Sequence, residues 1–151
     1  MRYFWLPVVL LFSACGFDEK TDVMFECASP SGARIATVYR VSSGDRPGDQ
    51  EMKVNVHPAG SSLNDNMHSF SFKHGYDVIL TWHSDHDMAI EYPADSEITH
   101  QEMVIFGTSQ TFSSSDQIRV DYQEKPSTHG YFVVEKRCFT EVLTRMDFST
   151  P

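Results

Sequence analysis

The sequence predicts an all-β, mainly antiparallel domain, with a β-sandwich and a short C-terminal helix as the preferred architecture. About eight short segments alternate apolar and polar residues with the period of two that is typical of strands. Turn-forming residues separate these segments. The chain has 151 residues, 40% of them hydrophobic and 22% charged, so it is long enough to close two sheets over one core. A single sheet covered on one side by the C-terminal helix is the alternative.

Residues 1–14 have the composition of a secretory signal. One basic residue, Arg2, precedes an apolar run over 3–12, and two small residues follow. The run is too short to cross a bilayer, which requires about 20 apolar residues. We therefore expect this segment to be removed from the mature protein.

The end of this segment, Leu11-Phe12-Ser13-Ala14-Cys15, resembles the lipobox of bacterial lipoproteins. The resemblance implies that Cys15 is the first mature residue and that it carries lipid chains, one of which is palmitate. Residues 15–22 would then be an acylated tether and 23–151 a single β-rich domain. Gly16, in place of an aspartate after the cysteine, implies an outer-membrane protein that faces the periplasm. An ordinary cleaved signal followed by an unmodified cysteine is the alternative.

The charge balance of the chain is acidic, with 21 Asp and Glu against 12 Lys and Arg and a net charge of −9. Loss of residues 1–14 removes one basic residue, Arg2, so the mature chain would carry 11 basic side chains and a formal charge of −10. This balance argues against nucleic acids and anionic lipid headgroups as partners, because both are polyanions. It does not identify a cationic partner, since acidity also keeps proteins soluble.

Three cysteines are present. If Cys15 carries lipid, Cys27 and Cys138 remain as an even pair in an oxidising compartment, which predicts a disulfide. The two residues are 111 positions apart. The loop-entropy model assigns about 4.7 kcal/mol of stabilisation to a disulfide that closes a loop of about that length. Two buried thiols that pack as small apolar side chains are the alternative.

The clearest strand signal lies between Tyr76 and Tyr92, where apolar residues at alternate positions flank a polar turn over 83–87. This pattern predicts a β-hairpin that ends at Pro93. The breaker-rich run over 42–50 predicts a mobile loop, and 93–101 shows turn residues without a period. The predicted strands are 23–28, 34–41, 52–57, 69–73, 77–82, 88–92, 103–107 and 117–122.

The C-terminal segment is ambiguous. Residues 131–138 favour a strand, because two adjacent valines and an aromatic pair follow Gly130. Phe139, Val142, Leu143 and Met146 then recur at helical spacing, which predicts one or two turns of helix.

Two motifs of this chain resemble those of small uncharacterised envelope proteins of bacteria. The first is S-P-x-G followed by A-x-V-Y-R, and the second is V-x-L-x-W-x-S-D-x-x-M-x-I-x-Y. The resemblance covers most of 27–122 and implies a hairpin-rich β fold without an assigned reaction. The matching residues are Ser29, Pro30, Gly32, Ala36, Val38, Tyr39, Arg40, Val78, Leu80, Trp82, Ser84, Asp85, Met88, Ile90, Tyr92, Ile118, Val120 and Tyr122.

The densest group of potential metal ligands is His83, Asp85, His86 and Asp87. Imidazole and carboxylate suit zinc or another transition metal, but adjacent turn residues rarely converge on one ion and no helical H-E-x-x-H spacing is present. We interpret this group as a solvated turn whose aspartates bond the backbone, with metal binding as the weaker alternative.

Other groups with chemical potential are also interpreted structurally. The remaining histidines, His57, His68, His74, His100 and His129, are expected at the surface. Aromatic residues at alternating strand positions are expected in the core, namely Tyr39, Phe70, Phe72, Trp82 and Tyr92. The chain has no G-x-S-x-G, no phosphate-binding glycine loop and no C-x-x-C.

These observations favour a non-enzymatic binding or accessory module of the cell envelope, held to the membrane by its lipid. Its partner would be an envelope protein or peptidoglycan, and no cofactor is expected. A metal-binding protein or metal-dependent hydrolase that uses residues 83–87 is the first alternative. An inhibitor or immunity-like lipoprotein that inserts the 42–50 loop into a target enzyme is the second.

Overall fold

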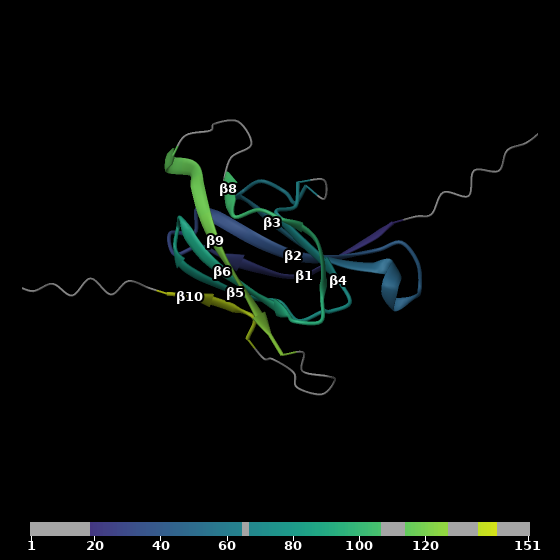
Figure 1. Ribbon diagram of the computed structural model, residues 1–151. Helices are drawn as coiled ribbons and strands as arrows, with labels where there is room; N and C mark the ends of the chain where they lie inside the picture. The colour runs from purple at the N-terminus through teal and green to yellow at the C-terminus, as the bar shows by residue number, and fades with distance from the viewer. Residues whose placement is uncertain (1–18, 65–66, 107–113, 127–135, 142–151) are drawn as a thin grey trace, which may run out of the picture.

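Two five-stranded sheets pack face to face in the computed structural model, which describes residues 19–64, 67–106, 114–126 and 136–141 (Figure 1). The first sheet has the order β1 (Lys20–Ala28), β2 (Arg34–Ser42), β3 (Gln50–Pro58), β4 (Phe70–Lys73) and β7 (Glu97–Gln101). The second has the order β10 (Cys138–Thr140), β5 (Ile79–Ser84), β6 (Asp87–Pro93), β9 (Gln117–Lys125) and β8 (Val104–Phe106).

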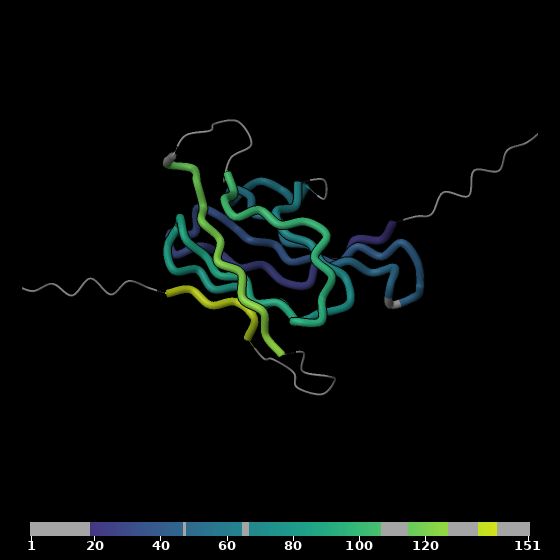
Figure 2. The backbone as a smooth tube through the Cα atoms, in the orientation of Figure 1, coloured from purple at the N-terminus to yellow at the C-terminus, as the bar shows by residue number. Residues whose placement is uncertain are grey.

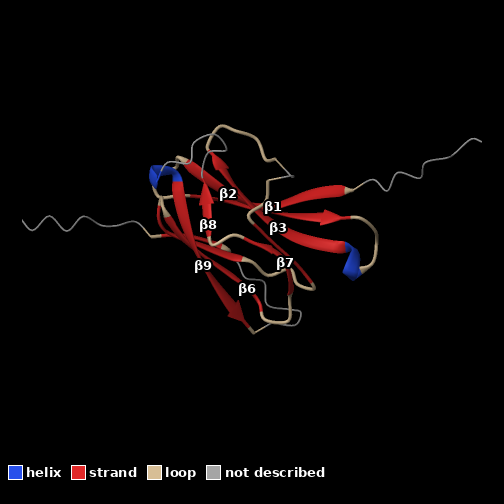
Figure 3. Cartoon of the chain, turned by 45° about the horizontal axis from the view of Figure 1, so that its top comes forward, coloured by secondary structure: helices blue, strands red, loops and turns tan. Residues whose placement is uncertain are grey.

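Most neighbouring strands are antiparallel, and the second sheet contains the exceptions. β10 runs parallel to β5, and β9 runs parallel to β6, whereas every pair in the first sheet is antiparallel. Two short 3-10 turns, η1 (Pro47–Asp49) and η2 (Ser114–Asp116), are the only helical elements among the described residues. Turning the molecule brings both sheets into view together (Figure 3). The predicted all-β sandwich is confirmed.

One face of each sheet builds the core, as the alternating pattern predicts. Trp82, Leu80 and Val78 of the hairpin region are fully buried, and so are Phe70 and Phe72 from the opposite sheet. Burying a side chain of this size contributes about 1.5–3 kcal/mol, so this face provides the main drive for the sheets to pack. The other core residues are Cys27, Ala36, Val38, Met52, Val54, Val56, Met88, Ile90, Tyr92, Ile105, Ile118 and Val120.

Tyr39 differs from the other aromatic residues that the sequence assigns to the core. It is fully buried, but it does not belong to the cluster between the sheets. Its neighbours in the ladder are Val23 and Lys53, whereas the flanking residue Val38 packs into the core. Because side chains alternate along a strand, Tyr39 lies on the outer face of the first sheet.

The predicted hairpin is present and its turn is tighter than the sequence indicates. β5 and β6 pair Trp82 with Met88 and Ser84 with Asp87, so only Asp85 and His86 form the turn. The ladder contains an irregularity between Trp82 and Ser84. The polar residues at either side of the turn therefore extend the strands rather than form a loop.

Three segments differ from the sequence expectation. β7 occupies part of 93–101, where no period is visible, because all five of its residues are exposed on an edge strand. β1 begins at Lys20, within the segment expected to be a tether. The third segment is the start of the predicted C-terminal helix. Phe139 and Thr140 belong to β10 and pair with β5, so their backbone groups form hydrogen bonds between strands and not within a helix. Residues 131–135 and 142–146 lie outside the described part of the chain.

The 42–50 loop closes on itself. Ser43 N donates to Asp49 O at 3.0 Å, and Asp49 N donates to Arg46 O at 2.9 Å. A carboxylate oxygen of Asp49 accepts from Arg46 N at 3.3 Å. These bonds form η1 inside the run that the sequence marks only as breaker-rich.

No helix in the described ranges is long and apolar enough to cross a membrane.

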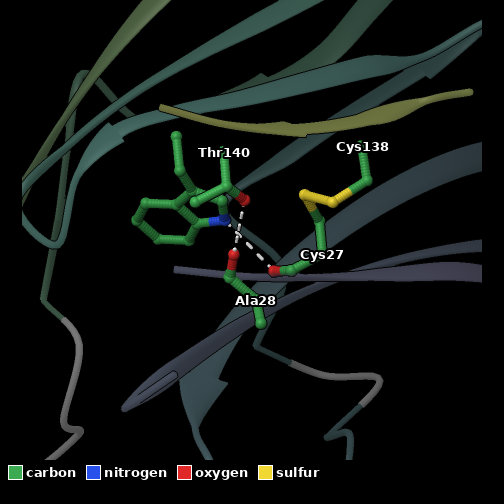
Figure 4. Close-up of a disulfide and its surroundings, with 5 residues drawn as sticks. Cys27, Ala28, Cys138 and Thr140 are labelled. Atoms are coloured by element: carbon green, nitrogen blue, oxygen red, sulfur yellow. Dashed lines mark hydrogen bonds between the residues drawn. A yellow bond between two sulfur atoms is a disulfide. The ribbon is translucent and has the colours of Figure 1, made fainter. Parts of the chain in front are cut away.

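A disulfide between Cys27 and Cys138 joins the two sheets along one side, as the sequence predicts. The Sγ atoms of Cys27 in β1 and Cys138 in β10 lie at bonding distance, with their Cα atoms 5.4 Å apart (Figure 4). Beside them, Thr140 Oγ1 donates to Ala28 O at 3.1 Å and Trp82 Nε1 donates to Cys27 O at 3.1 Å. Strands from the beginning and the end of the domain are therefore held together.

We predict that the double variant Cys27→Ser/Cys138→Ser loses about 4 kcal/mol of its free energy of unfolding, because the unfolded chain regains the entropy of a long loop. Urea denaturation monitored by Trp82 fluorescence measures the change. Cys15→Ser serves as the control and should leave the unfolding midpoint unchanged. Two alkylatable thiols at 27 and 138 in the native, non-reduced protein would contradict the link.

Candidate functional site

Three turns from distant parts of the chain meet at one end of the sandwich, which we call the turn end. They are residues 29–32 between β1 and β2, Asp85 and His86 between β5 and β6, and η2 before β9. Figure 2 shows these turns at the end opposite the start of β1 and the β2–β3 loop. Hydrogen bonds between the turns join the two sheets at this end.

Arg34, the first residue of β2, is the centre of the turn end. Its Nη1 donates to Asp85 O and lies 3.1 Å from His86 Nδ1. Its Nη2 donates to Ser115 O at 3.3 Å and lies 3.9 Å from an Asp116 carboxylate oxygen. The side chain is only 12% exposed. The two Nη groups therefore donate to two backbone carbonyls, and the Asp116 carboxylate at 3.9 Å adds an ion-pair contact without a hydrogen bond. A guanidinium is well suited to bind such a set.

Asp85 ties the 29–32 turn to the hairpin. One of its carboxylate oxygens accepts from Ser31 N at 3.0 Å. Burial raises the pKa of Asp85, but hydrogen bonds from the Ser31 backbone and from the hydroxyls of Ser29 and Ser31 outweigh it and leave the pKa below its ordinary value. The S-P-x-G and S-D motifs, which lie more than 50 positions apart in the sequence, therefore form one contact.

Beside this contact the surface has a hollow of about 360 Å³, which we call the Arg119 hollow. Its lining comes from the hairpin turn, from β8, and from the η2–β9 segment. Val104 is 43% exposed and provides an apolar wall. The lining residues are His86, Val104, Ser115, Gln117 and Arg119.

His86 lies between Arg34 and Gln117. Its Nδ1 is 3.1 Å from Arg34 Nη1 and 3.1 Å from Gln117 O. Arginine only donates and a carbonyl only accepts, so the tautomer of the ring decides which of the two contacts is a hydrogen bond. In both tautomers Nδ1 is engaged within the turn end, and Nε2 is the ring nitrogen left for a ligand.

Among the described residues, Arg119 is the one side-chain cation that lines the hollow. Its Nη2 lies 2.8 Å from an Asp87 carboxylate oxygen, and its side chain is 76% exposed. The hydrogen bond that Arg119 donates to Asp87 raises the pKa of Arg119. Within the described part of the chain Arg119 makes no other side-chain hydrogen bond, so several of its five N–H groups point to solvent.

The potential metal ligands of the hairpin turn diverge. His83 Nδ1 pairs with Glu141, the residue after β10, at 3.1 Å. Asp85, His86 and Asp87 instead contact Ser31, Arg34 and Arg119, respectively. Among the described residues, no three His, Cys, Asp or Glu side chains lie close enough to hold a metal ion. The structure thus does not bring these four residues together.

A second polar cluster, which the sequence does not reveal, lies where β4 meets β7. The rings of His68 and His100 stand edge to face with centroids 5.1 Å apart, and His100 Nε2 lies 3.3 Å from a Glu102 carboxylate oxygen. In the described ranges, His68 Nδ1 is buried without a hydrogen-bond partner. Burial, Lys53 and His100 lower the pKa of His68, and Glu51 and Glu102 oppose them only in part.

His57 departs from the expectation that the scattered histidines lie at the surface. It is 8% exposed, and its Nε2 lies 2.9 Å from Thr37 Oγ1. Its Nδ1 lies 3.1 Å from Pro58 O and 3.3 Å from Ser61 Oγ. The Ser61 hydroxyl donates to Pro58 O at 2.8 Å instead of to the ring, so the serine is not an activated nucleophile. His129 lies outside the described residues.

Sequence reasoning identifies Asp85 and His86 but assigns them to a solvated turn, and it misses Arg34, Gln117 and Arg119. The sequence contains one signal for Arg34, because it is a charged residue that follows a glycine turn and begins an apolar strand. Comparison with known proteins adds no assignment: no protein-family model, no curated protein and no solved structure matches this chain.

We predict that Arg34→Met destabilises the domain by about 2 kcal/mol, because carbonyls of two separate turns lose one charged donor at once. Arg119→Met is the matched control: it breaks a single exposed ion pair and should leave the unfolding midpoint close to that of the wild type. Urea denaturation of both variants measures the difference. Equal midpoints for the two variants would show that Arg34 does not organise the turn end.

We also predict that acidification destabilises the domain through His68. The pKa of His68 in the fold lies below the unfolded value of 6.5, so the unfolded chain binds more protons between the two values. The stabilising contribution is complete above 6.5 and disappears as the pH falls through the folded pKa. His68→Gln should flatten the unfolding free energy between about pH 7 and pH 5, whereas His83→Gln should retain the wild-type slope.

Proposed function

We propose that this protein is a lipid-anchored binding module of the bacterial cell envelope, and that the turn end is its binding surface. The observation that carries the proposal is the convergence of three turns on Arg34, which builds a hollow beside them, and no group of three potential metal ligands lies among the described residues. Such an arrangement suits recognition, because both Nη groups of Arg34 are used to hold the turns together.

The cysteine pair supports an exported protein. A link between Cys27 and Cys138 persists in an oxidising compartment and is rare in a reducing one. Export agrees with the signal-like composition of residues 1–14, and the lipobox resemblance at Cys15 supplies an anchor. A triacylated cysteine carries enough apolar surface for stable attachment, at about 0.8 kcal/mol for each buried CH₂.

The direction of β1 supports the placement of the binding surface. A lipid on Cys15 would hold the domain by the start of β1 at Lys20, while the chain runs along β1 toward the turn end. A strand of nine residues spans roughly 30 Å. The Arg119 hollow would thus face away from the membrane that holds the anchor, where an envelope partner can reach it.

We predict that a photo-crosslinking amino acid at Gln117 gives a discrete adduct in living cells, because this side chain lines the hollow. The same probe at Gln50, near the opposite end, is the matched control and should give none. Cys15→Ala should abolish both palmitate labelling and the Gln117 adduct, since the unanchored protein leaves its site. An adduct that persists unchanged in Cys15→Ala would count against the anchored module, and equal adducts at both positions would count against the turn end.

A further inference from the structure

We propose that the Arg119 hollow binds the acetamido group of an N-acetylated amino sugar, so that the partner of the module is the glycan chain of peptidoglycan. This inference rests on the proposed function and deepens it, because it chooses a sugar ligand over a protein.

The hollow offers hydrogen-bonding groups from three different side chains. His86 engages its Nδ1 with Arg34 and Gln117 O, which leaves Nε2 for a ligand. Arg119 uses one group for Asp87 and keeps several N–H groups for a ligand. The side-chain amide of Gln117 provides a donor and an acceptor together. A ligand for this set must present oxygen acceptors and at least one N–H or O–H.

The charges around the hollow exclude a polyanion. Arg119 is paired with Asp87 at 2.8 Å, and Arg34 lies 3.9 Å from Asp116. The carboxylate of Asp85 is a third negative charge at the turn end, beside the two cations Arg34 and Arg119. With a net charge of −9 over the whole chain, a phosphate-rich or multiply carboxylated ligand would be repelled. The ligand is therefore neutral and polar.

An acetamido group matches both the polar and the apolar parts of the lining. Its carbonyl accepts from a donor such as Arg119, and its N–H donates to an acceptor such as the Gln117 amide oxygen. Its methyl group requires an apolar wall, and Val104, 43% exposed, provides one. A plain glucose ring has no methyl group for that wall, so the hollow should discriminate between the two sugars.

The size of the hollow fits a short piece of a glycan chain. Its volume of about 360 Å³ lies at the lower end of the range for small-molecule sites, which corresponds to roughly one or two sugar rings. It is lined by residues from β8, β9 and the hairpin turn and not by one flexible loop. Because the Arg34 contacts hold the hairpin turn against η2, the lining is preformed.

The test uses the full chain in detergent and two neutral probes, the trimer of N-acetylglucosamine and maltotriose. Chemical-shift titration should show binding of the acetylated trimer at least ten-fold tighter than that of maltotriose. Arg119→Gln should weaken binding of the acetylated trimer about ten-fold, since it removes the charged donor. Arg46→Gln, in the β2–β3 loop at the opposite end, is the matched control and should bind as the wild type does.

Each result decides between the two proposals. Equal affinities for both trimers, or no shifts at millimolar acetylated trimer, would overturn the acetamido assignment. If a protein adduct at Gln117 is still found in cells in that case, the binding module stands and its ligand is a polypeptide. If the trimer binds but Arg119→Gln binds it equally well, the site lies elsewhere on the molecule.

Discussion

The structure depends on the burial of one strand face between the two sheets, with Trp82 at its centre. The indole is fully buried, so its N–H must find a partner, and it donates to Cys27 O of the opposite sheet. This bond fixes how β5 lies over β1. The sulfur link and the Thr140 contact to Ala28 lie on the same side, and the Arg34 contacts lie at the end where these strands turn. All of these contacts form only when the two sheets are stacked in this way.

The sequence was a good guide wherever one face of a strand is buried and the other is not. Val78, Leu80 and Trp82 show that pattern and were placed correctly. β7 was missed because an edge strand with every residue exposed has no apolar period. The start of the helix expected from Phe139 was wrong, because apolar spacing says nothing about the pairing of Phe139 and Thr140 with β5, 58 positions earlier in the chain. Local pattern cannot report such long-range pairs.

The candidate site was less predictable than the fold for the same reason. Arg34 binds Asp85 and Ser115, which are 51 and 81 positions away, and no local spacing encodes that meeting. Asp85 and His86 were visible as polar turn residues, but their roles depend on the partner that each one faces. Likewise His57 resembles a surface histidine in the sequence, yet Thr37 and the 58–61 turn enclose it. Residues of this kind are recognised only after topology is known.

The pairing of β10 with β5 has a consequence for how the molecule is made. β5 and β1 receive their last neighbours from Cys138–Thr140, the last of the described strands in the sequence. A ribosome or a translocation channel delivers this strand after the other described strands, so the sandwich stays open along one side until β10 emerges. Contacts of such high sequence separation slow folding and favour a late closing step. During that interval β5 remains an unpaired edge, which a chaperone could shield.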